Sequence, residues 1–164
     1  MNITIIVGII MLSVFIVPVW IVMQRQKKNK KKLEAYLASL EKEKNIKITE
    51  HETWSNKVIG IDSDHGNALF VSEGAGSKQV NLVDLHQVSR CIAERSTVSS
   101  ESKSSLQAVS AVRIRFVARN KAYSDKVFVL FNEDTDGTIG SEIRIADAWV
   151  ERFNKLIKSM PKAA

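Results

Sequence analysis

The sequence lacks the residue sets on which most catalytic sites depend. Cys91 is the only cysteine, so no disulfide can form within the chain, which suits a reducing compartment. The three histidines, His51, His65 and His86, are scattered and no Gly-x-Ser-x-Gly motif is present, so no triad signature is found. The Gly-Ala-Gly stretch at 74–76 lacks the Lys-Ser/Thr of a phosphate loop. We therefore predict no catalytic residue, no metal site and no cofactor, in a protein that is not an enzyme.

Two acidic turns resemble parts of metal sites without completing one. Asp62, Asp64 and His65 put three potential ligands in one turn, but tight turns require the same residue types. Residues 132–137 resemble the first half of a calcium loop, with Asp134 and Asp136 at alternating positions. The second half fails, because an isoleucine stands where the bidentate glutamate is needed. We interpret both segments as acidic turns.

A long apolar segment lies near the N-terminus. Residues 3–23 carry no charged side chain, and as a helix they would span roughly 31 Å, close to the ~30 Å hydrocarbon thickness of a bilayer. No small-residue cleavage site closes the segment, which favours an uncleaved signal-anchor over a signal peptide. Trp20 lies where an aromatic ring would meet the headgroups. We expect a transmembrane helix over residues 1–24.

The positive charge of the chain is concentrated just after this segment. The cations are Arg25, Lys27, Lys28, Lys30, Lys31 and Lys32. Because cations resist translocation, we expect them at the membrane interface of a single-pass inner (plasma) membrane protein, with the N-terminus outside and the C-terminal domain in the cytoplasm. The whole chain has 24 Lys and Arg against 18 Asp and Glu, and this cluster accounts for the excess. The rest is neutral, so we expect no nucleic-acid partner.

An amphipathic helix is expected within the juxtamembrane segment 25–45. Leu33, Tyr36, Leu37 and Leu40 recur at helical spacing among charged residues, as in a stalk helix. This apolar stripe is narrow and needs a partner. The partner is either the following domain or a second copy of the stalk, which would make the stalk a site of self-association.

After Asn45 the apolar period changes to two and turn residues recur at short intervals, which indicates antiparallel hairpins. The expected strands cover residues 54–62, 68–72, 79–85, 87–95, 112–119 and 126–131. Apolar residues alternate with arginines in 112–119, so one face of that strand is buried. Residues 126–131 form an apolar run after a lysine, which predicts a strand covered on both sides or a central one. The serine-rich segment 96–110 is predicted to be a loop.

The last element is predicted to be a helix from about Ser141 to Met160. Its apolar face consists of Ala146, Trp149, Val150, Phe153, Leu156, Ile157 and Met160. We expect this face to cap the sheet. The resulting domain covers residues 46–160 and leaves a short tail, 161–164.

This order of elements resembles a pleckstrin-homology-like (PH-like) domain. Six or seven short antiparallel strands are followed by one amphipathic helix, and Trp149 stands at the place of that family's characteristic helix tryptophan. The resemblance covers about Ile46 to Met160. It implies a mainly β fold, a strongly bent antiparallel sheet of two near-orthogonal halves capped by the C-terminal helix, with a binding activity. Lipid-binding members carry several Lys and Arg in the first hairpin loop, whereas here that loop is acidic (62–67), which favours protein binding.

The best candidate contact surface is a row of cations on one strand face. Arg113, Arg115 and Arg119, continuing to Lys121, could grip an acidic partner, although such arginines also keep a sheet free of edge pairing. We expect a membrane-anchored binding or scaffold module that holds a partner protein or larger assembly at the inner membrane. The alternatives are a peripheral sensor of anionic lipid headgroups and a self-associating structural subunit.

Overall fold

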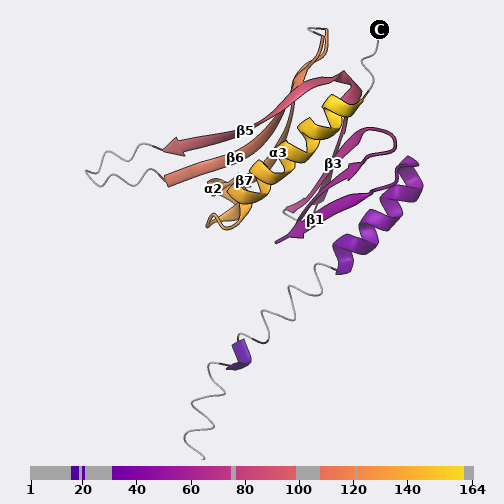
Figure 1. Cartoon of the computed structure of the whole chain (residues 1–164). Coiled ribbons are helices and arrows are strands. Elements are labelled where there is room, and N and C mark those ends of the chain that lie inside the picture. Colours follow the sequence, from indigo (N-terminus) through magenta and orange to yellow (C-terminus); the bar gives the residue numbers. More distant parts are fainter. Residues whose placement is uncertain are drawn as a thin grey trace, which may run out of the picture.

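Two antiparallel sheets and a C-terminal helix make up the described part of the chain (Figure 1). The computed structural model describes residues 16–18, 20, 31–74, 77–98, 108–120 and 122–160. The first sheet has the strand order β1-β2-β3-β4 and the second β5-β6-β7, so the predicted mainly β fold with a terminal helix is confirmed. The elements are β1 (Glu50–Trp54), β2 (Lys57–Asp62), β3 (Asn67–Gly74), β4 (Ser77–Asp84), the 3-10 helix η1 (Leu85–Gln87), β5 (Val88–Val98), β6 (Ala108–Ala118), β7 (Lys126–Asn132), α2 (Glu133–Asp136) and α3 (Glu142–Ser159).

The predicted membrane-spanning helix, and the location based on it, are corrected by the structure. Among the described residues, no helix has both the length and the apolar character needed to cross a bilayer. Such a span needs about 20 continuous apolar helical residues. Of the expected span 1–24 the structure describes only 16–18 and 20, which are helical, and the rest lies outside the described residues. We withdraw the single-pass, signal-anchored inner-membrane assignment.

The first predicted strand, 54–62, contains the last residue of β1, a turn and the whole of β2. The chain reverses at Ser55, whose φ of 47° lies in the left-handed region, and Trp54 pairs with Lys57 across the turn. No glycine or proline marks this turn. The rest of β1 was not predicted, because its residues before Trp54 are polar.

The helix over residues 31–44 packs against the outer face of the first sheet (Figure 1). Its stripe leucines Leu33, Leu37 and Leu40 are buried, and they form a second core with side chains of β2 and β3, namely Val58, Leu69 and Val71. Each buried leucine contributes about 1.5–3 kcal/mol before the loss of conformational entropy. The partner of the stripe is therefore the domain, and β2 is buried on both of its faces.

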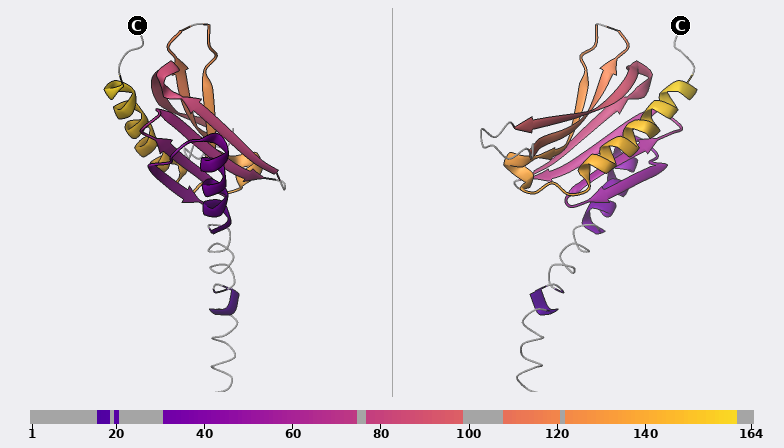
Figure 2. Two further views of the ribbon diagram at one scale, coloured as in Figure 1. Left: turned by 90° about the vertical axis from the view of Figure 1, so that its right-hand side faces the viewer. Right: turned by 60° about the vertical axis from the view of Figure 1, so that its left-hand side comes forward.

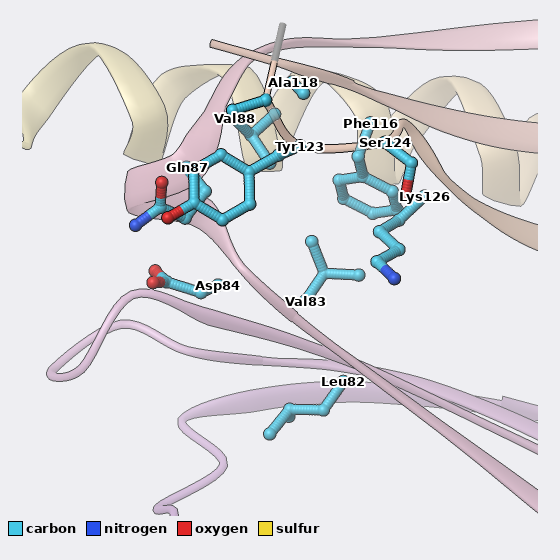
Figure 3. Close-up of a pocket in the computed structure, with 11 residues that line it drawn as sticks. Leu82, Val83, Asp84, Gln87, Val88, Phe116, Ala118, Tyr123, Ser124 and Lys126 are labelled. Atoms are coloured by element: carbon cyan, nitrogen blue, oxygen red, sulfur yellow. The ribbon is translucent and has the colours of Figure 1, made fainter. Parts of the chain in front are cut away.

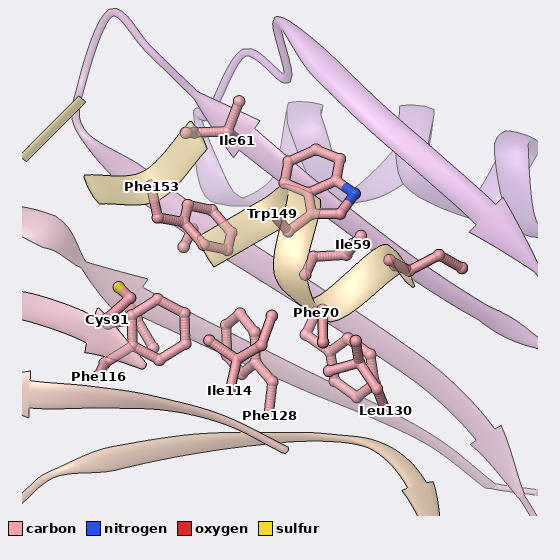
Figure 4. Close-up of a cluster of buried hydrophobic side chains, with 14 of the residues drawn as sticks. Ile59, Ile61, Phe70, Cys91, Ile114, Phe116, Phe128, Leu130, Trp149 and Phe153 are labelled. Atoms are coloured by element: carbon pink, nitrogen blue, oxygen red, sulfur yellow. The ribbon is translucent and has the colours of Figure 1, made fainter. Parts of the chain in front are cut away.

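The main core fills the space between the two sheets and α3 (Figure 4). Phe128 of β7 stacks on Phe70 of β3 with ring centroids 5.3 Å apart, and contacts Phe116 of β6 at 4.6 Å. Phe153 of α3 lies 5.3 Å from Phe116 and 5.5 Å from the fully buried Trp149. These rings connect both sheets to the C-terminal helix, as the apolar face of that helix predicted.

The helix α3 closes one side of the sandwich (Figure 2), where its side chains bond to β1 and β5. The carboxamide of Asn154 takes the place of a neighbouring strand, because its Oδ1 accepts from the Cys91 N–H at 2.8 Å and its Nδ2 donates to the Cys91 C=O at 2.9 Å. On the β1 side, Trp149 Nε1 donates to Glu52 at 2.9 Å. Burial raises the pKa of the Cys91 thiol to about 12, so this cysteine is an unreactive core residue.

Candidate binding groove between β4 and β7

The opposite side of the sandwich is bounded by β4 and β7, each of which is the last strand of its sheet. β4 pairs only with β3, and β7 only with β6, among the strands that the structure describes. The free edge of such a strand presents backbone N–H and C=O groups to which another strand can bond. Two cavities lie along this side, and we call the space they occupy the β4–β7 groove.

The first cavity lies where β4 turns into β5 and has a volume of about 320 Å³ (Figure 3). Val83 and Phe116 form its apolar floor, and Asp84, Tyr123 and Lys126 stand around its mouth. The Tyr123 side chain is 55% exposed. This end of the groove therefore combines an apolar floor with one anionic and one cationic group.

The second cavity lies at the other end of the same two strands and has a volume of about 490 Å³. It is more polar than the first, because carboxamide and hydroxyl side chains line much of it. These are Asn56, Ser72, Ser77, Gln79, Asn132 and Thr135. The start of β4 meets the end of β7 here, whereas the end of β4 meets the start of β7 at the first cavity. The two strands thus run in opposite directions along the groove.

A partly buried ion pair lies in the wall of the second cavity. Lys57 Nζ lies 2.5 Å from Asp136 Oδ2 and donates to the Leu130 C=O of β7 at 3.0 Å. Asp136 Oδ2 also accepts from the Asn132 N–H at 2.8 Å. The carboxylate that the calcium-loop resemblance would use is thus bonded to the chain itself. These contacts hold the end of β7 in place beside the start of β2.

The strand β7 exposes apolar side chains on the outer face of its sheet, and one of them, Val129, also lines the second cavity. Val127 and Val129 are 40% and 38% exposed, whereas Phe128 and Leu130, which alternate with them along the strand, are buried. The prediction that this run is a central strand or one covered on both sides is wrong. Within β7 no charged residue follows Lys126. This is unusual for an edge strand, because natural edges are normally protected by charge, proline or a covering element.

The predicted arginine surface lies on β6 and just after its end, one strand away from the groove edge. Arg115 pairs with Glu94 at 2.9 Å, Arg113 donates to Ser96 Oγ at 3.0 Å, and Arg119 donates to the Val88 C=O at 3.4 Å. In the strand register Arg113 and Arg115 stand beside Val129 and Val127 of β7. The structure therefore gives these three arginines bonds within their own sheet. Lys121, the fourth cation of the expected surface, lies outside the described residues.

The residues expected at a membrane interface are only partly described. Trp20 is helical and 60% exposed. Lys31 and Lys32 are exposed at the start of the described helix 31–44. The other predicted interface cations, Arg25, Lys27, Lys28 and Lys30, lie outside the described residues.

The acidic turn at Asp62 is a structural element. The fully buried Asp62 carboxylate accepts from the backbone N–H groups of Lys47, Asp64 and His65, each at 3.1 Å, and from His65 Nδ1 at 2.8 Å. Burial alone would raise the pKa of Asp62, but these hydrogen bonds outweigh it and the pKa lies below its usual value. Within the described ranges, no cluster of three or more His, Cys, Asp or Glu side chains could hold a metal ion.

Comparisons with protein-family models, curated proteins and solved structures each found no match for this chain. The groove itself offers free backbone edges, an apolar floor and carboxamide side chains, which together suit an extended polypeptide. Sequence reasoning missed this site, since its residues come from strands far apart in the chain. The one local signal was the uncharged apolar run of β7.

Proposed function

We propose that this protein is a non-catalytic protein-binding module with a PH-like fold, which holds a partner polypeptide in the β4–β7 groove. The PH-like assignment is supported by the order of four strands, then three strands, then one helix that carries the buried Trp149. The observation that carries the proposed function is the exposed apolar edge of β7 beside two cavities. Exposed apolar surface next to concave polar surface is typical of a binding site.

The two alternative functions have less support in the described residues. The arginines that a lipid sensor would direct at headgroups are bonded to Glu94, Ser96 and Val88 of the same sheet. The stalk leucines that a self-associating subunit would use are covered by the first sheet. Both observations favour the groove as the contact surface.

A peptide-library selection against the full-length chain tests this proposal. We expect the selected peptides to bind the unmodified chain and to lose most of their affinity for Val129→Glu. The matched control is Val117→Glu, the same change on the central strand β6, where the new carboxylate lies beside Arg90 in the register. Arg113 likewise stands beside Val129, so both variants give the carboxylate a cationic neighbour. Failure to select any peptide, or equal losses in the two variants, would overturn the proposed site.

A further inference from the structure

We infer that the ligand of the groove is an extended segment of a partner protein that adds to the free edge of β7 as an extra strand. This inference rests on the proposed function and specifies how the partner is held. In strand addition, backbone hydrogen bonds supply much of the affinity and alternate side chains supply the specificity. The following features of β7 and β4 point to this mode.

The edge of β7 differs from the other three outer edges of the described sheets. Asn154 occupies the β5 edge at Cys91. β1 carries Glu50 and Glu52, which pair with arginines of α3. β4 carries the charged residues Lys78 and Asp84. At the end of β7, Lys57 bonds the Leu130 C=O and Asp136 bonds the Asn132 N–H. Among the described residues, the part of this edge from Lys126 to Val129 has no such cover and is mainly apolar, so a further strand can pair there at least cost.

The core-facing side of β4 shows that a covering layer is missing there. Val83 is buried in the main core. Gln79 and Asn81 lie four and two residues before it and therefore project from the same face of the sheet. Both are nevertheless exposed. A strand added to β7 would lie opposite these carboxamides and offer them hydrogen-bond partners.

The side-chain pattern of the added strand follows from these neighbours. Its inward residues face Gln79 and Asn81 and should be polar, such as Thr, Ser or Asn. Its outward residues lie beside Val127 and Val129 and should be β-branched and apolar. The partner segment therefore alternates between the two classes.

The charges at the two ends of β7 give the segment a polarity. Lys126 begins the strand, and the exposed Glu133 and Asp134 follow its end. A segment with an acidic residue beside Lys126 and a basic residue beside α2 would match both ends. The reverse arrangement would place like charges together at each end.

Backbone methylation of the selected peptides tests strand addition directly. In a strand, the N–H groups of alternate residues point toward the same neighbour, so only one of the two alternating sets can bond to β7. We expect each N-methyl group in that set to weaken binding to the full-length chain by about tenfold, and each in the other set by less than about threefold. Hydrogen exchange should also slow in residues 126–130 when the peptide is bound.

The remaining outcomes separate this inference from the proposed function. If Val129→Glu abolishes binding but methylation shows no alternation, a partner docks in the groove by its side chains and strand addition is overturned. Selected sequences without polar and β-branched alternation would also overturn it. A full-length chain that dimerises without peptide, and is split by Val129→Glu but not by Val117→Glu, would show that β7 pairs with a second copy instead. Loss of binding in both variants alike would remove the groove itself.

Discussion

The two sides of the sandwich differ in how their unpaired strand edges are covered. On the α3 side, Asn154 bonds both backbone groups of Cys91 and Arg95 forms an ion pair with Asp147 at 2.6 Å. On the β4–β7 side, no described element covers the edge of β7 from Lys126 to Val129, and the carboxamides of β4 are exposed. The comparison indicates that one side of the molecule provides stability and the other remains available for a partner.

The largest expected difference between the two sides concerns their aromatic residues. Trp149→Ala on the closed side removes a fully buried ring and should lower the free energy of unfolding by about 4 kcal/mol. Tyr123→Ala on the open side removes a ring that is 55% exposed and should cost less than about 1 kcal/mol. Chemical denaturation of both variants gives the two values. Similar losses would mean that the groove is part of the stabilising core.

The next effect concerns the ion pair at the end of the groove. Lys57→Met leaves the partly exposed Asp136 carboxylate and the Leu130 C=O without their cationic partner, and should lower the free energy of unfolding by about 2.5 kcal/mol. Lys47→Met is the control, because Lys47 pairs with Asp64 at 3.4 Å on the exposed surface, and should cost less than about 0.5 kcal/mol. Equal unfolding midpoints for the two variants would contradict a structural role for Lys57.

A smaller effect separates the carboxamides of the two sides. Asn154→Ala leaves the Cys91 N–H and C=O unpaired at the β5 edge and should cost about 2 kcal/mol. Asn81→Ala on the open side removes an exposed side chain and should change stability by less than about 0.5 kcal/mol. Urea unfolding of the pair measures the contrast, and a reversed order would show that the open side is the better bonded one.

The smallest effect involves a carboxylate that belongs to neither side. Asp62 has a lowered pKa in the folded state, so its stabilising contribution is present above the unfolded pKa of about 3.9 and is lost as pH falls through the folded pKa. Asp62→Asn should cost about 1 kcal/mol near neutral pH. The unfolding free energies of this variant and the unmodified chain should converge in acid. If the difference between the two unfolding free energies does not change with pH, the stabilisation does not depend on the charge of Asp62.

The sequence predicted the elements in which one face is buried and the other is exposed. Val112 and Ile114 alternate with arginines in β6, and the apolar face of α3 recurs at helical spacing, so both were located to within a few residues. β1 was missed because its polar residues carry no periodic signal and the turn at Ser55 contains neither glycine nor proline. Local patterns describe a strand, but they do not show which strand ends a sheet.

Two predictions that were based on apolar runs are corrected by the structure. The apolar run of β7 suggested a covered strand, whereas the sheet order leaves it at an edge. The apolar run at the N-terminus suggested a bilayer span, whereas the described residues contain no helix that meets the requirements of one. The run of β7 shows that an apolar segment needs to be covered, but which element covers it depends on the tertiary structure.

The packing of helix 31–44 has a practical consequence for anyone who expresses part of this chain. A fragment that starts at Ile46, where the period of the sequence changes, would uncover Val58, Leu69 and Val71 of the first sheet. Such a fragment should bind hydrophobic dyes and precipitate on warming. One that starts before Leu33 keeps the leucines over those residues, so the smallest workable truncation begins in the helix and not at the first strand.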